Sequence, residues 1–222
     1  MQIAKLESSD KLTEFRDFVF GLAGTSTHTE FSQALCDAHT GGNNLAADIQ
    51  DRALNSSEFE ALVRDDEWLM LASEHLGIEK SYTKIVFPHF RVDLPDQFKS
   101  DSQKMLLPWH QEAAYYLPKG DCTTQSIVLS TILHDAAEEN GALLVAEEAE
   151  QDFQEHESRF MDNQRKRFFR VECTPPKSST VAETSFGETV VFDFLAKHRS
   201  GNNTSPLVRL TFLLRASDTR LI

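Results

Sequence analysis

The stretch KIVFPHFRVDL, residues 84–94, decides the fold, because the spacing of apolar residues changes there. Before this stretch, apolar residues recur every three or four positions, which is typical of amphipathic helices. From it onward, short apolar or alternating runs are interrupted by Pro88 and Pro95, which is typical of strands. We therefore expect the chain to change from helices to strands near residue 83.

Three apolar stripes with helical spacing precede residue 80. They are Leu12, Phe15, Phe18, Val19 and Leu22; then Phe31, Leu35 and Ala38; and then Phe59, Leu62, Val63, Trp68, Leu69, Leu71 and Ala72. Gly21 and Gly24 are expected to end the first helix, and the polar run 39–44 is expected to be a loop. No strand is apparent in this part of the sequence. We predict a helical region, residues 1–80, that braces a sheet.

Many short segments with strand character follow. Besides the two runs within 84–94, they are 105–107, 113–117, 125–133, 142–146, 168–173, 189–195 and 207–214. Residues 147–167 are polar and densely charged, so we expect a surface excursion there. A helical start followed by many short strands is typical of a jelly roll flanked by helices. We predict a single domain over 1–222, with a β core over 83–214.

Composition excludes several classes of protein. The formal charge of -13 argues against nucleic acid as a partner, because proteins that bind a phosphate backbone concentrate Lys and Arg. Cys36, Cys122 and Cys173 are far apart and form no CxxC motif, which favours a reducing, cytoplasmic environment. The N-terminus lacks an apolar signal core, and no apolar run approaches the roughly 18 residues of a membrane span. We expect a cytoplasmic protein without membrane association.

A candidate metal site starts at His110 and Glu112, two positions apart in a predicted strand. Strand alternation would place both side chains on one face. His198, on a distant segment, offers a third ligand. Two imidazoles and one carboxylate leave three positions of an octahedral metal open, which suits a non-haem Fe(II) oxygenase. Two of these can hold a bidentate 2-oxo acid and the third can receive dioxygen.

Arg209 is the candidate partner for the distal carboxylate of such a 2-oxo acid, because arginine binds carboxylates through two parallel hydrogen bonds. A single HxE motif is weak evidence, since it occurs by chance in many proteins. The ordered combination of HxE, a later histidine and an arginine eleven residues beyond that histidine is more specific.

This combination resembles the phytanoyl-CoA dioxygenase-like family of 2-oxoglutarate oxygenases, over about residues 87–214. The resemblance is carried by WHQE at 109–112 with Tyr115 and Tyr116, ENGAL at 139–143, and HRSGNNTS at 198–205 followed by Arg209. It implies a mainly β fold with N-terminal helices, the cupin-like jelly roll called the double-stranded β-helix.

The resemblance also implies roles for individual residues. His110, Glu112 and His198 would bind Fe(II), while Arg209, helped by Ser200, would hold the co-substrate 2-oxoglutarate. The implied reaction uses dioxygen, releases succinate and CO2, and hydroxylates a small-molecule substrate.

The sequence departs from the family pattern at three places. Glu112 stands where most relatives have Asp, and residues 146–150 read AEEAE where many have Pro-Gly-Ser-His. Ser130 replaces an aromatic residue that borders the co-substrate in relatives, so we expect Gln125 or Thr131 to supply polar contacts.

Two alternatives stay open at this point. One is a non-catalytic binding protein that kept the jelly roll, and the other is a cupin-type metalloenzyme that does not use 2-oxoglutarate. The sequence leaves the substrate and the oligomeric state open.

Overall fold

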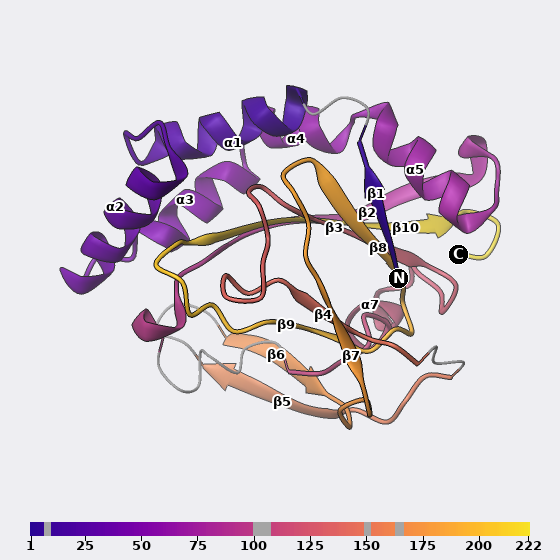
Figure 1. The fold of residues 1–222 in the computed structure, drawn as a ribbon. Coiled ribbons are helices and arrows are strands. Elements are labelled where there is room, and N and C mark those ends of the chain that lie inside the picture. The colour runs from indigo at the N-terminus through magenta and orange to yellow at the C-terminus, as the bar shows by residue number, and fades with distance from the viewer. Residues whose placement is uncertain (7–9, 100–107, 149–151, 163–166) are drawn as a thin grey trace.

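The computed structural model describes residues 1–222 except 7–9, 100–107, 149–151 and 163–166 (Figure 1). Its helices are α1 (Asp10–Leu22), α2 (His28–Thr40), α3 (Leu45–Leu54), α4 (Ser57–Val63), α5 (Asp66–Leu76) and α7 (Ala113–Tyr116), with 3-10 helices η1 (Lys80–Tyr82), η2 (Asp96–Phe98) and η3 (Leu117–Lys119). Its strands are β1 (Gln2–Lys5), β2 (Thr83–Asp93), β3 (Ile127–Ile132), β4 (Leu143–Ala146), β5 (Glu157–Asp162), β6 (Arg167–Glu172), β7 (Ser179–Ala182), β8 (Glu188–Asp193), β9 (His198–Ser200) and β10 (Arg209–Asp218). Within the described ranges, no helix is both long and apolar enough to cross a membrane.

The strands form one large sheet and two smaller ones, and all pairs are antiparallel. The large sheet has the order β1-β8-β3-β10-β2, the second has the order β7-β4-β9, and β5 pairs with β6. Helices α1 to α5 cover one face of the large sheet, and the smaller sheets lie on the opposite side (Figure 1). The predicted fold class, a mainly β jelly roll with N-terminal helices, is confirmed.

Strand alternation divides the side chains of β10 between two layers. Leu210, Phe212 and Leu214 join the apolar core beneath the helices, where Phe212 packs at 5.3 Å from Trp68, measured between ring centroids. The alternate residues point to the other face, toward the smaller sheets, and include the buried Arg209 and Arg215. The space between the sheets therefore receives the polar side chains of an otherwise apolar strand.

The helical region differs from its prediction in two respects. The third stripe forms two helices, α4 and α5, because the Asp65 side chain accepts from the Glu67 amide and starts a new helix. Helix α3 was not predicted, since its apolar residues Ala46, Ile49 and Ala53 form a narrow stripe. The predicted helix around residues 31–38 is present as α2, which begins with a capping box between Thr27 and Glu30.

Two segments without a predicted strand contain one. Strand β1 pairs with β8, so residues 1–80 contribute an edge strand to the large sheet as well as the helices that cover it. Strand β5 lies inside the segment 147–167, which we expected to be a surface excursion, and it pairs with β6. Strand β1 is only four residues long and β5 (ESRFMD) is largely polar, so neither shows a clear apolar period in the sequence.

The predicted strand over 113–117 is wrong. The chain turns into α7 there, with the Ala114 amide donating to the Gln111 carbonyl and the Tyr115 amide donating to the Glu112 carbonyl. The apolar run favoured a strand, but after the Ala113 amide, which donates to the Phe194 carbonyl, the following amides bond locally. The predicted strand at 105–107 lies outside the described residues.

A β-bulge interrupts the pairing of β2 with β10. Leu213 pairs with His89 and Arg215 pairs with Val86, so Phe87 and Pro88 together lie opposite one residue of β10. Phe87 has φ 47°, in the left-handed region that a bulky residue rarely adopts. Bulges of this kind redirect the backbone next to functional sites.

Candidate metal centre

Backbone pairing brings the two candidate histidines together. His110 and His198 form an isolated antiparallel bridge, in which each amide donates to the other residue's carbonyl, at 3.1 Å and 2.9 Å. Directly opposite residues of such a pair place their side chains on the same face. The two imidazole rings accordingly lie 4.3 Å apart, centroid to centroid, and both residues are buried.

Glu112 reaches the same point from the start of α7. It has helical backbone angles, φ -58° and ψ -31°, so the chain curls after His110 instead of continuing as a strand. Its Oε2 atom lies 3.7 Å from Nε2 of His110 and 3.4 Å from Nε2 of His198. One oxygen of the carboxylate therefore faces both rings.

Both histidines have the tautomer that a metal requires. Nδ1 of His110 lies 2.7 Å from the Pro108 carbonyl and Nδ1 of His198 lies 3.0 Å from the Ala196 carbonyl. A carbonyl oxygen only accepts hydrogen bonds, so each Nδ1 carries the proton and each Nε2 presents a lone pair. Burial lowers the pKa of His110, and neighbouring His198 lowers it further, which keeps that lone pair available.

The donor set fits a divalent transition metal. One ligand atom from each of His110, Glu112 and His198 can be chosen so that all lie within 4.8 Å of one another. Two ligands with metal bonds of about 2.1 Å can be at most about 4.2 Å apart, and both carboxylate–imidazole distances are shorter than that. Two imidazoles and one carboxylate are the ligands of a facial triad with open positions.

Arg215 keeps the carboxylate of the triad ionised. Burial alone would raise the pKa of Glu112, but the Arg215 guanidinium beside it holds that pKa well below its usual value. Nε and Nη2 of Arg215 donate to Oε1 of Glu112 at 2.7 Å and 2.5 Å. Glu112 is therefore an anionic ligand whose second oxygen is not used by the arginine.

Arg209 lies on the same strand and has a separate set of partners. Its Nη1 donates to the Gly141 carbonyl, and its Nη2 donates to Ser200 Oγ and to Asp93 Oδ2, both at 2.9 Å. Its Nε is buried and has no hydrogen-bond partner among the described residues. The arginine thus retains one buried donor for a ligand.

Asp93 is surrounded by basic side chains. Its Oδ1 accepts from Arg91 at 2.8 Å, and its Oδ2 accepts from Arg209. Burial would raise the pKa of Asp93, but Arg91, Arg209 and Lys99 together lower it strongly. A ligand carboxylate that binds Arg209 would therefore be repelled by the Asp93 carboxylate, which already binds this arginine.

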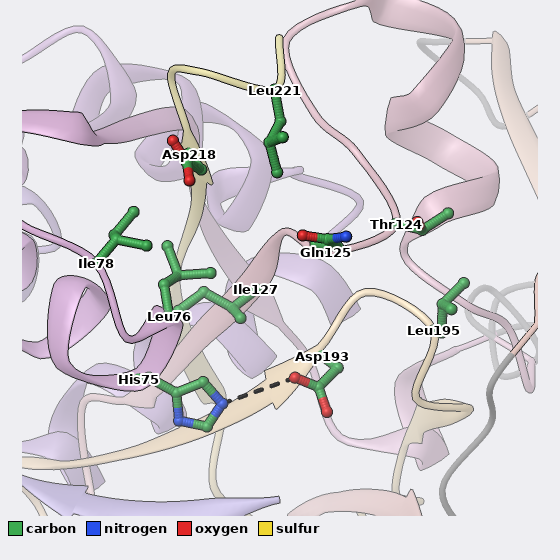
Figure 2. A pocket seen from close by; sticks show the side chains of 10 residues that line it. All are labelled: His75, Leu76, Ile78, Thr124, Gln125, Ile127, Asp193, Leu195, Asp218 and Leu221. Carbon is green, nitrogen blue, oxygen red and sulfur yellow. Dashed lines mark ion pairs between the residues drawn. The ribbon is translucent and has the colours of Figure 1, made fainter.

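The structure does not bring Gln125 or Thr131 to the triad. Gln125 is exposed and lines an open pocket near the C-terminus together with the ion pair His75–Asp193, at 3.7 Å (Figure 2). The Thr131 hydroxyl bonds to the Thr189 hydroxyl at 2.7 Å, and the alternation of β3 places it on the face of Leu129, beneath the helices. Both residues lie away from the face that carries Arg209.

Sequence reasoning missed three residues of the site, namely Asp93, Gln111 and Arg215. A charged residue within the buried apolar run 212–216 requires a buried partner, and that signal pointed to Arg215. Gln111 is fully buried and its side chain bonds to the backbone of Asp152, Leu195 and Gln154. Nothing in the local sequence identifies these distant partners.

Solved structures share this fold at low sequence identity. EvdO2 from Micromonospora carbonacea var. aurantiaca aligns with a TM-score of 0.54 and 22% identity, over 76% of this chain and 62% of EvdO2. The non-heme monooxygenase ThoJ aligns with a TM-score of 0.58 and 14% identity, over 99% of this chain and 75% of ThoJ. The epimerase SnoN, in complex with Fe3+, alpha ketoglutarate and nogalamycin RO, aligns with a TM-score of 0.52 and 14% identity, over 76% of this chain and 61% of SnoN.

This chain thus spans less than two thirds of the length of EvdO2 and of SnoN. No curated protein matches its sequence. The phytanoyl-CoA dioxygenase (PhyH) family matches residues 16–211, which is most of the chain and includes both histidines, Glu112 and Arg209. The chain belongs to the phytanoyl-CoA dioxygenase family.

Proposed function

We propose that this protein is an Fe(II)- and 2-oxoglutarate-dependent oxygenase that hydroxylates a small or medium-sized metabolite. The observation that carries the proposal is the buried triad His110, Glu112 and His198, whose donor atoms point at one another. Such a constellation of unprotonated imidazole nitrogens around a carboxylate oxygen is costly to bury unless a cation binds there. The substrate class, a small or medium-sized metabolite, and the outcome, hydroxylation, are both part of this proposal.

Different residues would bind the metal and the co-substrate. His110, Glu112 and His198 would hold the metal, and Arg209 with Ser200 would bind the distal carboxylate of 2-oxoglutarate. Bound Fe(II) with 2-oxoglutarate and dioxygen would supply the oxidation, in which a substrate C–H becomes C–OH and 2-oxoglutarate leaves as succinate and CO2. The unpartnered Nε of Arg209 supports a ligand at this position.

Two solved neighbours support the cofactor and the substrate class. EvdO2 has been crystallised with 2-oxoglutarate, and SnoN with Fe3+, alpha ketoglutarate and nogalamycin RO. SnoN is an epimerase and ThoJ a monooxygenase, so this fold carries more than one reaction. From these neighbours we carry over to this chain only the substrate class, a small organic molecule. Hydroxylation is the simplest outcome for a site with one carboxylate and two histidines.

The test is an anaerobic titration of metal-free protein with Fe(II) and then 2-oxoglutarate. We expect the visible charge-transfer band of a 2-oxo acid chelated to protein-bound iron. The band should be lost in His198→Ala, which removes a ligand, and weakened in Arg209→Ala, which removes the carboxylate partner. His75→Ala is the matched control, because His75 lies in the pocket of Figure 2, pairs with Asp193 and bonds to no residue of the triad, so the band should stay unchanged.

The same titration separates the alternatives. A protein that binds neither Fe(II) nor 2-oxoglutarate would be a jelly-roll binding protein rather than an oxygenase. Iron binding without the band, and oxygen uptake that is independent of 2-oxoglutarate, would indicate a cupin-type metalloenzyme. Undiminished turnover in His198→Ala would refute the ligand assignment.

A further inference from the structure

The Glu112 carboxylate divides its two oxygens between two partners. Nε and Nη2 of Arg215 both donate to Oε1, at 2.7 Å and 2.5 Å. Oε2 is the atom that faces the imidazoles of His110 and His198, at 3.7 Å and 3.4 Å. The arginine thus occupies one oxygen and leaves the other directed at the candidate metal position.

A glutamate at this position needs such a restraint. Its side chain has one more rotatable bond than aspartate, so its carboxylate can adopt more orientations and can offer a metal one oxygen or both. Two donors of a planar guanidinium converge on Oε1 and hold that oxygen in place, which leaves Oε2 as the oxygen available to a metal. A lysine ammonium in the same place would supply the positive charge but not these directional hydrogen bonds.

Arg215 is itself held on three sides. Its Nη1 donates to the Phe87 carbonyl at 2.9 Å, and its guanidinium lies 4.5 Å from the centroid of the Tyr116 ring. Phe87 is the residue of the β2 bulge with φ 47°, so the strained backbone turns a carbonyl toward the arginine. The residue is only 5% exposed, and such strain persists where the surrounding structure requires it.

We propose that Arg215 is a positioning residue of the metal centre, which restricts Glu112 to ligation through Oε2 alone. Glu112 and Arg215 then act as a pair, and the extra methylene of glutamate is what allows the carboxylate to reach both the arginine and the metal. The inference rests on the proposed metal site. It assigns to the chain a ligand orientation that the HxE motif does not specify.

Co(II) is the probe for the test, because its affinity can be measured calorimetrically and its visible absorption reports the number of ligands. Arg215→Lys retains the positive charge but loses the paired donors and the bond to Phe87. We expect Co(II) to bind about 10- to 100-fold more weakly in this variant, with an altered visible spectrum, as for other residues that orient metal ligands. Arg220→Lys is the matched control, because Arg220 is exposed and pairs with Asp218.

A double-mutant cycle tests whether the two residues act as a pair. Glu112→Asp should also weaken Co(II) binding, because the shorter side chain cannot reach both partners. Arg215→Lys should then add little further loss in the Glu112→Asp background. Additive losses would show that Arg215 does not act through Glu112.

Three outcomes would overturn the inference or its premise. Unchanged Co(II) affinity and spectrum in Arg215→Lys would mean that the arginine only neutralises a buried charge. If that variant does not fold, Tyr116→Leu removes the ring beside the guanidinium, and unchanged Co(II) binding there would count against positioning. Failure of the unmodified protein to bind Co(II) would remove the proposed metal site, whereas Arg215-dependent Co(II) binding without a 2-oxoglutarate band would remove only the proposed reaction.

Discussion

Arg209 and Arg215 lie six residues apart on β10 and have different carboxylate partners. Arg215 bonds to Glu112 at the triad, whereas Arg209 bonds to Asp93 beside the predicted co-substrate position. A charged side chain inside a protein requires a partner. For Arg209, this partner within the chain would compete with the proposed second partner, the distal carboxylate of 2-oxoglutarate.

Asp93→Asn is therefore expected to bind 2-oxoglutarate more tightly. The amide keeps the shape of the side chain but removes a negative charge close to the incoming carboxylate. We expect a gain on the order of tenfold, measured by anaerobic titration of the charge-transfer band. Asp121→Asn, at an exposed ion pair with Lys84, is the control. Weaker binding in Asp93→Asn would show that Asp93 orients Arg209 instead of competing for it.

Two glycines of the sequence motifs, Gly141 and Gly201, stand where a side chain would not fit. A Cβ added to Gly201 would lie 2.5 Å from the Ala142 carbonyl oxygen, and one added to Gly141, at φ +83°, would lie 3.2 Å from Nη1 of Arg209. The backbones of the two motifs therefore touch beside the arginine, which only glycine allows.

Gly201→Ala should lower the free energy of unfolding by about 1–3 kcal/mol, the usual cost of overpacking against a rigid backbone. Urea denaturation measures this change. Gly21→Ala is the control, because its added methyl meets no atom within 4 Å in helix α1 and should be neutral or stabilising. Equal stability of the unmodified protein and Gly201→Ala would contradict the steric argument.

Among the elements, the segment between β4 and β5 bonds to Gln111, beside the candidate metal site. Gln111 lies between two candidate ligands, donates to the Asp152 and Leu195 carbonyls at 3.0 Å and 2.7 Å, and accepts from the Gln154 amide at 2.7 Å. His156 also accepts from the Gln111 amide at 3.1 Å. The charged segment is thereby held next to the triad.

Gln111→Ala should loosen residues 152–156 without unfolding the sheets. Each lost neutral hydrogen bond contributes about 0.5–1.5 kcal/mol, so local opening should become roughly tenfold more frequent. Hydrogen exchange of peptides covering 152–156 should accelerate, while peptides from β3 and β10 keep their protection. Unchanged exchange in 152–156 would mean that other contacts hold this segment.

For the whole molecule, the buried His134 and the partly buried His28 make stability depend on pH. His134 and His28 stack at 4.5 Å between centroids, and burial followed by the nearby charge of His28 lowers the pKa of His134 to about 4. Nδ1 of His134 bonds to the Asp135 carbonyl, and its Nε2 accepts from the Leu210 amide. Arg209 lowers and Asp135 raises the same pKa, while Arg16 lowers that of His28.

The free energy of unfolding should therefore fall as the pH falls from about 6.5 to about 4. In this window the unfolded chain binds a proton at residue 134 and the folded chain does not, so the unfolded state gains stability. A shift from 6.5 to about 4 corresponds to about 3 kcal/mol. Urea unfolding at several pH values measures the slope, which should be smaller in His134→Gln. An equal slope in that variant would assign the effect to other groups.

Local periodicity accounts for what could be predicted of the architecture. The stripe from Leu12 to Leu22 and the apolar runs of β3, β8 and β10 are long enough to show their period, and each was predicted near its observed bounds. Strand β1 has only four residues, and β5 (ESRFMD) is largely polar, so neither shows an apolar period. The run 113–117 was assigned to the wrong class because a short apolar run fits either structure.

The residue types and their order, by themselves, determined the family, the candidate triad His110, Glu112 and His198, and the position of the helical region before most of the strands. These depend on chemistry and local spacing, which are written in the chain. Only the tertiary structure decided that Arg215 binds Glu112 and that Asp93 binds Arg209. It also decided that Gln125 and Thr131 lie away from the site. Those relations join residues as far as 116 positions apart through strand order, register and a bulge, and no local pattern records which strands become neighbours.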